Sequence, residues 1–259
     1  MAAEQGTNQS VERAAAVLRA LAEGRPERRV SDVAAGAGLG ASTASRLLAT
    51  LEQLDLVERD PVSGLYRLSL GTVSLAAVAL NADPVHRASR MVLQALAART
   101  GLGANVGIRR GGELMFLANF EGARTPRAYT QAGHTAPLHA TAMGKCLLSR
   151  MTGAERRDLL GPDLEAPTEH TITSHDRLDS VVDEVRRTGY ATEAEERALG
   201  RASVAAPVRD AADQVVAAVS LWGPASLLAE ENEGAGRSGD LTRQVIEAAD
   251  AVSQALGAH

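Results

Sequence analysis

The chain has 259 residues, enough for two domains that each bury a core of their own. Its net charge of −5 argues against binding through overall positive charge, and its single cysteine excludes an intrachain disulfide and fits a reducing cytoplasm. Apolar runs are too short to span a membrane and the first ten residues lack a secretion-signal pattern, so we expect a cytoplasmic protein without a membrane partner.

The first part of the chain predicts two short helices and a tight turn. Residues 10–22 read as a helix with Ser10 as its N-cap, and residues 31–37 read as a second helix capped by Ser31. Gly38-Leu39-Gly40 follows as a turn in which glycine permits a positive φ. The buried stripe of the first helix is expected to consist of Val11, Ala14, Val17, Leu18 and Leu21.

A third helix, capped by Gly40, has two unlike faces. At about 100° per residue, apolar side chains gather on one face and small or polar side chains on the other. The apolar face holds Ala44, Leu47, Leu48, Leu51 and Leu54, and the opposite face holds Ser42, Ser45, Arg46, Ala49 and Gln53. Such a slim, nearly uncharged face is typical of a helix that enters a DNA major groove, although hydroxyl residues are also common at the start of an ordinary surface helix.

Two short strands follow the third helix, at residues 56–60 and 65–68, and a loop with Pro and Gly joins them. Helix, helix-turn-helix and two-stranded wing is the element order of a winged helix-turn-helix, which we expect over residues 1–69. Arg59 and Arg67 lie on adjacent strands. They are positioned either to contact DNA or to form solvated ion pairs with Glu58 or Asp60.

The remaining residues predict a linker helix over 70–82 and a mixed α+β domain over 83–259, opening with a helix that Asp83-Pro84 starts and that runs to residue 100. The other expected elements are strands at 102–121 (broken by a turn at 109–112), 203–208 and 214–222, and helices at 141–151, 174–188 and 239–256.

Five stretches in this order resemble the isocitrate-lyase-regulator (IclR) family of bacterial transcription factors: SVERAAAVLRALAE, GLGASTASRLLATLE, GLYRLSLG, PLHATAMGKCLL and RRTGYATEAEERALG. The resemblance covers nearly the whole chain. It implies an α+β two-domain protein with an N-terminal winged helix-turn-helix, a linker helix and a GAF-like effector-binding domain. It also implies homodimers paired through the N-terminal domains and commonly assembled into homotetramers, and we expect repression rather than activation.

The implied partner of the N-terminal domain is a double-stranded DNA operator. Arg46 is typical of the family's motif and is expected to anchor the backbone or contact guanine, while small residues beside it are expected to provide specificity. The first helical residues also offer free N–H groups to phosphate. The expected contacts are Ala41, Ser42, Thr43, Ser45, Arg46, Arg59 and Arg67.

The implied partner of the C-terminal domain is a small-molecule effector, an organic acid or an aromatic metabolite. The expected contacts are Ala142 and Met143 in the loop that enters a helix, Glu193 at a commonly acidic position, and Ser203, Ser220 and Trp222 pointing inward by strand alternation. Met143 and Trp222 favour an aromatic or partly apolar effector over a two- or three-carbon acid, unless both simply fill the core.

Two other function classes stay open. An enzyme would use Cys146 and His139 as an activated nucleophile, but an apolar helical run around Cys146 favours an inert thiol. The histidines at 134, 139, 170 and 175 lack metal-binding spacing, and EAEER (193–197) reads as a solvated loop, so we expect no catalytic residue, no metal and no cofactor. The other alternative is a DNA-binding protein whose C-terminal domain ignores ligands.

Overall fold

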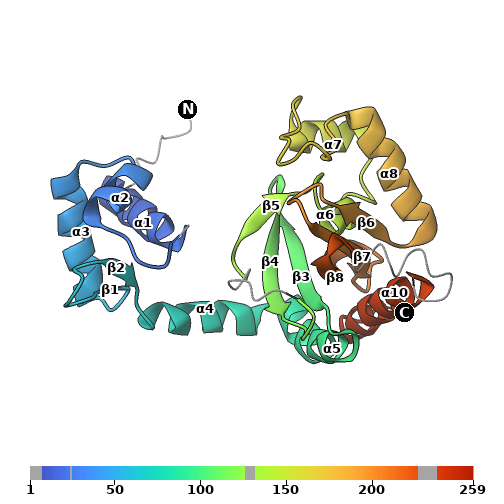
Figure 1. The fold of residues 1–259 in the computed structure, drawn as a ribbon, viewed down its shortest axis with the longest axis horizontal. Coiled ribbons are helices and arrows are strands. Elements are labelled where there is room, and N and C mark those ends of the chain that lie inside the picture. The colour runs from blue at the N-terminus through green and yellow to red at the C-terminus, as the bar shows by residue number, and fades with distance from the viewer. Residues whose placement is uncertain (1–7, 24, 126–131, 227–237, 259) are drawn as a thin grey trace. The chain divides into compact units, whose positions relative to one another are not determined.

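The computed structural model describes residues 8–23, 25–125, 132–226 and 238–258. The chain divides into two compact units, Met1–Asn81 and Ala82–His259 (Figure 1). Each unit is described by itself below.

The N-terminal unit consists of three helices and a two-stranded sheet. The helices are α1 (Gln9–Ala22), α2 (Val30–Gly36) and α3 (Ala41–Gln53), and the strands are β1 (Val57–Arg59) and β2 (Tyr66–Leu68). Apolar side chains from all five elements share one core, which consists of Val17, Ala20, Leu21, Val33, Leu48, Leu51, Val57 and Tyr66. The predicted helix-turn-helix and wing are therefore both present.

The turn before α3 follows the prediction at both glycines. Gly38 has a φ of +64°, which favours glycine, and Gly40 is the N-cap of α3 with extended backbone. In the wing, β1 and β2 pair antiparallel, and Arg28 adds a bridge that the sequence did not predict: its N–H donates to the Tyr66 carbonyl at 2.9 Å.

Several expected helix caps and buried positions were wrong. Asn8, not Ser10, caps α1, since its side chain accepts the Ser10 N–H at 3.1 Å. Arg29, without a side-chain cap, precedes α2, so Ser31 lies inside the helix. Val11 is 64% exposed and Leu54 is 63% exposed, because one lies in the first turn of α1, away from the packed region, and the other lies past the last turn of α3.

The expected helix over 70–82 is present as α4 (Gly71–Ala82). None of its residues is buried, although its sequence is strongly apolar, and Val73, Leu75 and Val78 are each more than half exposed.

The C-terminal unit is built on a six-stranded antiparallel sheet with the order β5-β4-β3-β8-β7-β6. The strands are β3 (Gly103–Arg110), β4 (Glu113–Phe120), β5 (Thr135–Pro137), β6 (Ala191–Ala194), β7 (Arg201–Arg209) and β8 (Val215–Pro224). The helices are α5 (Pro84–Thr100), α6 (Ala142–Leu147), α7 (Gly153–Leu160), α8 (His175–Thr188) and α10 (Ser238–Ala255).

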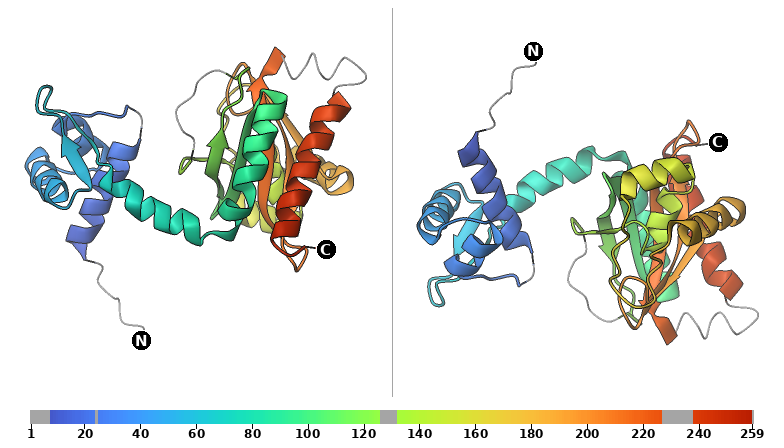
Figure 2. Two further views of the ribbon diagram at one scale, coloured as in Figure 1. Left: turned by 90° about the horizontal axis from the view of Figure 1, so that it is seen from below. Right: turned by 90° about the horizontal axis from the view of Figure 1, so that it is seen from above.

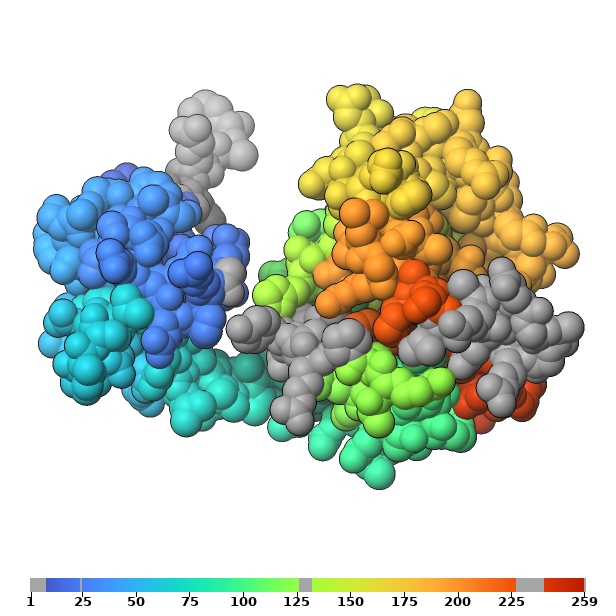
Figure 3. Space-filling model, viewed as in Figure 1, coloured from blue at the N-terminus to red at the C-terminus, as the bar shows by residue number. Residues whose placement is uncertain are grey.

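Helices cover both faces of this sheet. Figure 2 shows α5 and α10 side by side on one face, where α5 contacts β3 and α10 contacts β7 and β8. On the other face α6 packs against β7 and β8, and α7 and α8 form the outer surface there, coloured yellow to gold in Figure 3. Asp83 caps α5 as predicted, by accepting the His86 N–H at 2.8 Å.

The sequence missed β5, β6 and α7 and overestimated one helix. The helix expected over 141–151 is the short α6, which ends at Leu147. EAEER is not a solvated loop, because Glu193 is 7% and Glu196 is 8% exposed and both side chains are held inside the unit. Within the described helices, none has the length and apolarity required to cross a bilayer.

Candidate DNA-binding surface and ligand pocket

The polar face of α3 lies open on the N-terminal unit. Ala41, Ser42, Ser45 and Arg46 are exposed, as are Ala49 and Gln53, while Thr43 is partly buried. The apolar face packs inward through Ala44, Leu48 and Leu51. Figure 3 shows the segment that contains α3, in light blue, at the surface of this unit. The helix therefore presents one guanidinium among small side chains, as the sequence predicts.

The two wing arginines differ in their surroundings. The Arg67 guanidinium donates to Glu58 and, at 2.7 Å, to Glu27, and these hydrogen bonds raise the pKa of Arg67. Arg59 lies over the ring of Tyr66 at 5.6 Å, and its Nε donates to the Gly64 carbonyl at 3.3 Å. Of the two alternatives for the wing arginines, the solvated ion pair describes Arg67. Its partners are Glu58, as expected, and Glu27, whereas Asp60 is not one of them.

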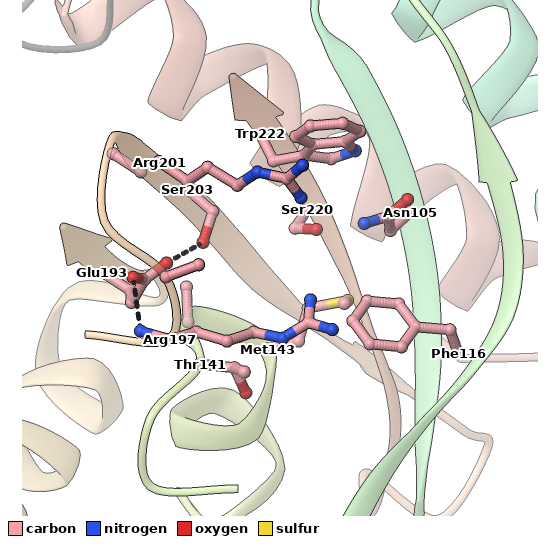
Figure 4. A pocket seen from close by; sticks show the side chains of 13 residues that line it. Asn105, Phe116, Thr141, Met143, Glu193, Arg197, Arg201, Ser203, Ser220 and Trp222 are labelled. Carbon is pink, nitrogen blue, oxygen red and sulfur yellow. Dashed lines mark hydrogen bonds between the residues drawn. The ribbon is translucent and has the colours of Figure 1, made fainter. Parts of the chain in front are cut away.

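A cavity of about 290 Å³ opens on the α6 face of the C-terminal sheet (Figure 4). All six residues expected to contact an effector line it: Ala142, Met143, Glu193, Ser203, Ser220 and Trp222. Asn105, Phe116, Thr141, Arg197 and Arg201 also line it and were not predicted.

Strand register explains why these side chains meet. Ser203 pairs with Glu193 on one side and with Trp222 on the other, and Trp222 pairs with Gly103. Paired residues on neighbouring strands share a face of the sheet, so the four positions form one row across it. A Cβ at position 103 would lie 2.2 Å from the indole, so glycine there is what lets Trp222 lie across β3.

Glu193 is a buried carboxylate whose oxygens are already engaged. Oε1 accepts the backbone N–H groups of Glu196 at 2.8 Å and Arg197 at 3.2 Å, and Oε2 accepts the Ser203 hydroxyl at 3.0 Å. Burial raises the pKa of Glu193, with the charge of Glu196 acting in the same direction and these hydrogen bonds opposing it. Glu193 therefore shapes the segment that follows β6.

Two arginines bring positive charge to the cavity, and each lies against an aromatic ring. The Arg197 guanidinium lies 4.8 Å from the centre of the Phe116 ring, and the Arg201 guanidinium lies 5.2 Å from that of Trp222. The sequence analysis did not include these two arginines in the site, because it interpreted EAEER and the residues around it as solvent-exposed. The sequence did hold one indication of their position: both arginines follow Glu193 closely, and Arg201 stands at the start of a strand.

The start of α6 forms the opposite wall. The Thr141 side chain accepts the Gly144 N–H at 3.0 Å and caps the helix. Ala142 and Met143 are thus the first helical residues rather than loop residues, and the helix itself supplies no acceptor for their N–H groups. At position 144 a Cβ would lie 2.0 Å from the Leu138 carbonyl oxygen, so glycine allows α6 to approach this close.

Beneath the cavity, the only lysine of the chain forms a buried ion pair. Lys145 is 1% exposed, and its ammonium donates to the Glu196 carboxylate and to the Thr192 carbonyl at 3.2 Å. This pair ties α6 to the segment that carries Glu193 and Arg197.

The groups of the enzyme alternative do not meet. The Cys146 thiol donates to the Ala205 carbonyl at 3.5 Å, and burial strongly raises the pKa of Cys146, which favours the unreactive thiol. His139 Nε2 instead lies 2.7 Å from the Glu165 carbonyl oxygen. No group of three His, Cys, Asp or Glu side chains in the described ranges is arranged to hold a metal ion.

Comparison with known sequences finds two domain families. Residues 10–61 match the IclR helix-turn-helix domain, and residues 77–254 match the bacterial transcriptional regulator IclR C-terminal domain. The glycerol operon regulatory protein of Streptomyces coelicolor is 34% identical over 250 residues, which cover 96% of this chain and 97% of that protein. The transcriptional repressor AllR of Klebsiella pneumoniae is 32% identical, with 96% and 90% covered.

Solved structures share the fold. An IclR transcriptional regulator from Alicyclobacillus acidocaldarius superposes with a TM-score of 0.83 at 27% identity, covering 97% of this chain and 100% of that one. An IclR homologue from Microbacterium hydrocarbonoxydans, crystallised with 4-hydroxybenzoate, has the same fold with a TM-score of 0.80 at 20% identity, covering 96% and 99%. The relatives are regulators rather than enzymes. The chain therefore belongs to the IclR family of bacterial transcriptional regulators, with a helix-turn-helix domain for DNA and a C-terminal domain for an effector.

Proposed function

We propose that this regulator is a repressor whose affinity for its operator is controlled by an organic anion bound in the cavity of the C-terminal unit. The observation that carries the proposal is the cavity itself: it gathers Arg197, Arg201 and Trp222 with Ala142 and Met143, the first two residues of α6. Guanidinium and free N–H groups both bind carboxylates, and the aromatic ring favours an occupant with a flat or apolar body.

On the DNA side, the polar face of α3 is the proposed recognition surface. The small side chains of Ala41, Ser42 and Ser45 let the backbone approach base edges, and Thr43 adds a hydroxyl at the same end. Arg46 is exposed at the centre of this face, where it can reach guanine or phosphate. Arg59 is the wing residue favoured for a phosphate contact, because Arg67 is held by two carboxylates.

The proposed assembly is a homodimer formed through the N-terminal units. Two such dimers then associate into a tetramer. Support comes from α4, whose valines and leucine are exposed in the single chain. A partner surface would bury these apolar side chains. We expect Val78→Glu to lower the mass measured by light scattering, whereas Val62→Glu, at an exposed valine of the wing loop, leaves it unchanged.

Two relatives support repression as the mode of regulation, and the DNA partner supports a cytoplasmic location. Two relatives, the AllR proteins of Klebsiella pneumoniae and Escherichia coli, are named repressors, and bacterial DNA lies in the cytoplasm. A reporter gene behind the operator is expected to be silenced by the protein and released by the effector. Activation by the unliganded protein would contradict the repressor assignment.

The function is tested by measuring operator and effector binding in one preparation. Operator duplexes are selected from random DNA with the unaltered protein, and affinity is measured at fixed salt. We expect Arg46→Ala to weaken specific binding by about 1–3 kcal/mol, while Arg110→Ala, an exposed arginine of the other unit, has no effect. Trp222 is the only tryptophan, so its fluorescence reports directly on cavity occupancy. Equal operator affinity for Arg46→Ala and the unaltered protein would refute the DNA assignment.

A further inference from the structure

Two buried polar groups in the wall of the cavity lack hydrogen-bond partners. Asn105 is 3% exposed and Trp222 is 5% exposed, and both residues line the cavity. The Asn105 Oδ1, an acceptor, and the Trp222 indole N–H, a donor, have no partner in the part of the chain that the structure describes. Buried polar groups are nearly always hydrogen-bonded in folded proteins, so both are left for an occupant of the cavity to satisfy.

The acceptor and the donor lie next to each other on the α6 face of the sheet. Trp222 pairs with Gly103, and its indole lies across β3 at that residue. Asn105 stands two residues further along β3, so its side chain points to the same face. Figure 4 shows the indole nitrogen at the edge of the ring that is nearest Asn105. The two groups are therefore neighbours, yet no hydrogen bond joins them.

The surroundings of these two groups are mostly apolar, with one further hydroxyl. Phe116 and Met143 line the same cavity and are both buried, and an unpaired polar group costs most free energy in such an environment. Ser220 pairs directly with Asn105 across β8 and β3 and also lines the cavity. Its hydroxyl can either donate or accept beside an occupant.

The type of group that fits here follows from counting donors and acceptors. A carboxylate, ketone or ether only accepts, so it leaves the Asn105 Oδ1 without a donor, whereas an ammonium only donates and leaves the indole N–H without an acceptor. A hydroxyl does both: its oxygen accepts the indole N–H, and its proton is donated to Oδ1. The Asn105 amide can turn about its last side-chain bond to present this oxygen.

We propose that the effector is a hydroxylated organic anion whose hydroxyl binds between Asn105 and Trp222, beside Ser220. This inference rests on the proposed function and narrows it from organic anions in general to those that carry a hydroxyl group. It assigns Asn105, which the sequence analysis did not include in the site, as a residue that determines specificity.

The test compares hydroxy acids with counterparts in which a methyl group replaces the hydroxyl, so that size and charge are kept. The pairs are glycolate and propionate, lactate and isobutyrate, meta-hydroxybenzoate and meta-toluate, and para-hydroxyphenylacetate and para-tolylacetate. Each is titrated into the full-length protein by calorimetry, with Trp222 fluorescence as a second readout. We expect at least one hydroxy acid to bind about 10-fold or more tightly than its methyl counterpart, because the methyl group leaves both buried groups unpaired.

Variants then assign this preference to the two residues. Asn105→Leu keeps the size of the side chain and Trp222→Phe keeps an aromatic ring, and each is expected to reduce the affinity ratio between hydroxy acid and methyl counterpart to about one. Asn119→Leu is the matched control: Asn119 pairs with Asn105 and its Oδ1 also lacks a partner among the described residues, but it does not line the cavity. Thermal unfolding confirms that each variant is folded, and if Asn105→Leu is not, Trp222→Phe carries the comparison.

The outcomes separate this inference from the function beneath it. If no hydroxy acid of the panel binds more tightly than its methyl counterpart, or if the preference survives in both Asn105→Leu and Trp222→Phe, the inference is wrong. Equal binding is the result expected if a water molecule, rather than the effector, joins the two groups. A methyl counterpart that binds equally well and still alters operator affinity would leave the proposed regulator intact. Failure of operator binding itself would instead refute the regulator.

Discussion

Glu193 combines a structural role with an electrostatic one. It holds the segment after β6 through the backbone N–H groups of Glu196 and Arg197, and it adds a negative charge beside the proposed anion site. Burial raises its pKa, so ionised Glu193 weakens folding at high pH, and this penalty disappears as pH falls through the folded-state pKa. Protonation of Glu193 also leaves the cavity more positive.

We therefore expect organic anions to bind more tightly as pH falls from mildly alkaline to mildly acidic. Glu193→Gln keeps acceptors for both N–H groups and removes the charge. It is expected to tighten anion binding at alkaline pH by about 1 kcal/mol, roughly fivefold, and to flatten the pH dependence. The other charged groups around Glu193 are Glu196, Arg197, Arg201 and Lys145. Calorimetry across the pH range checks the prediction, and an unchanged slope in the variant would contradict it.

The Lys145–Glu196 pair offers a test of how the cavity wall is held. Removing one member of a buried ion pair leaves the other charge uncompensated, which typically costs about 3–5 kcal/mol. Lys145→Met should therefore destabilise the C-terminal unit by that amount in urea, followed through Trp222 fluorescence.

The double variant provides the control for this prediction. Lys145→Met with Glu196→Leu removes both charges and is expected to recover most of the lost stability. Equal stability of Lys145→Met and the unaltered protein, within about 0.5 kcal/mol, would show that the pair does not hold α6 to the segment after β6.

At the scale of elements, the wing predicts a contrast between two exposed arginines. Arg67 would have to leave Glu27 and Glu58 before it contacts DNA, whereas Arg46 forms no ion pair with another described residue. Arg67→Ala should change operator affinity by less than about 0.5 kcal/mol, well below the effect of Arg46→Ala. Equal losses in the two variants, measured by anisotropy at fixed salt, would make the wing ion pairs irrelevant to DNA binding.

Long periodic elements could be predicted from the sequence, as could the two short wing strands, which flank a loop with Pro and Gly, whereas the short strands β5 and β6 could not. The two faces of α3 and the cap of α5 follow from residue spacing and cap chemistry alone. β5 and β6 have three and four residues, too few for alternation to stand out, and both are fixed by pairing with longer strands.

The residues that line the cavity could be predicted only in part. The family resemblance selected Ser203, Ser220 and Trp222, alternation along the two later strands indicated that they point inward, and all three line the cavity. Arg197 and Arg201 were missed because charge normally indicates exposure. Here tertiary packing overrides that rule: an aromatic ring lies against each guanidinium group, Arg201 reaches the cavity from the start of β7, and Arg197 reaches it from the segment after β6.

At the scale of the whole molecule, the chain joins a DNA-binding unit to an effector-binding unit through α4, and Asp83, whose backbone is extended, separates this helix from α5. An effector can control DNA binding only if it has different affinities for the operator-bound and free states. The alternative of a ligand-blind C-terminal domain predicts no such difference, even when the cavity is occupied.

One measurement separates these two accounts most directly. Operator affinity is determined by anisotropy at fixed salt, with and without the organic anion that binds most tightly, at a concentration that saturates the change in Trp222 fluorescence. Our account predicts a change of about fivefold or more in operator affinity for the unaltered protein and none for Arg201→Gln at the same ligand concentration. Saturation of Trp222 with an unchanged operator affinity would contradict it.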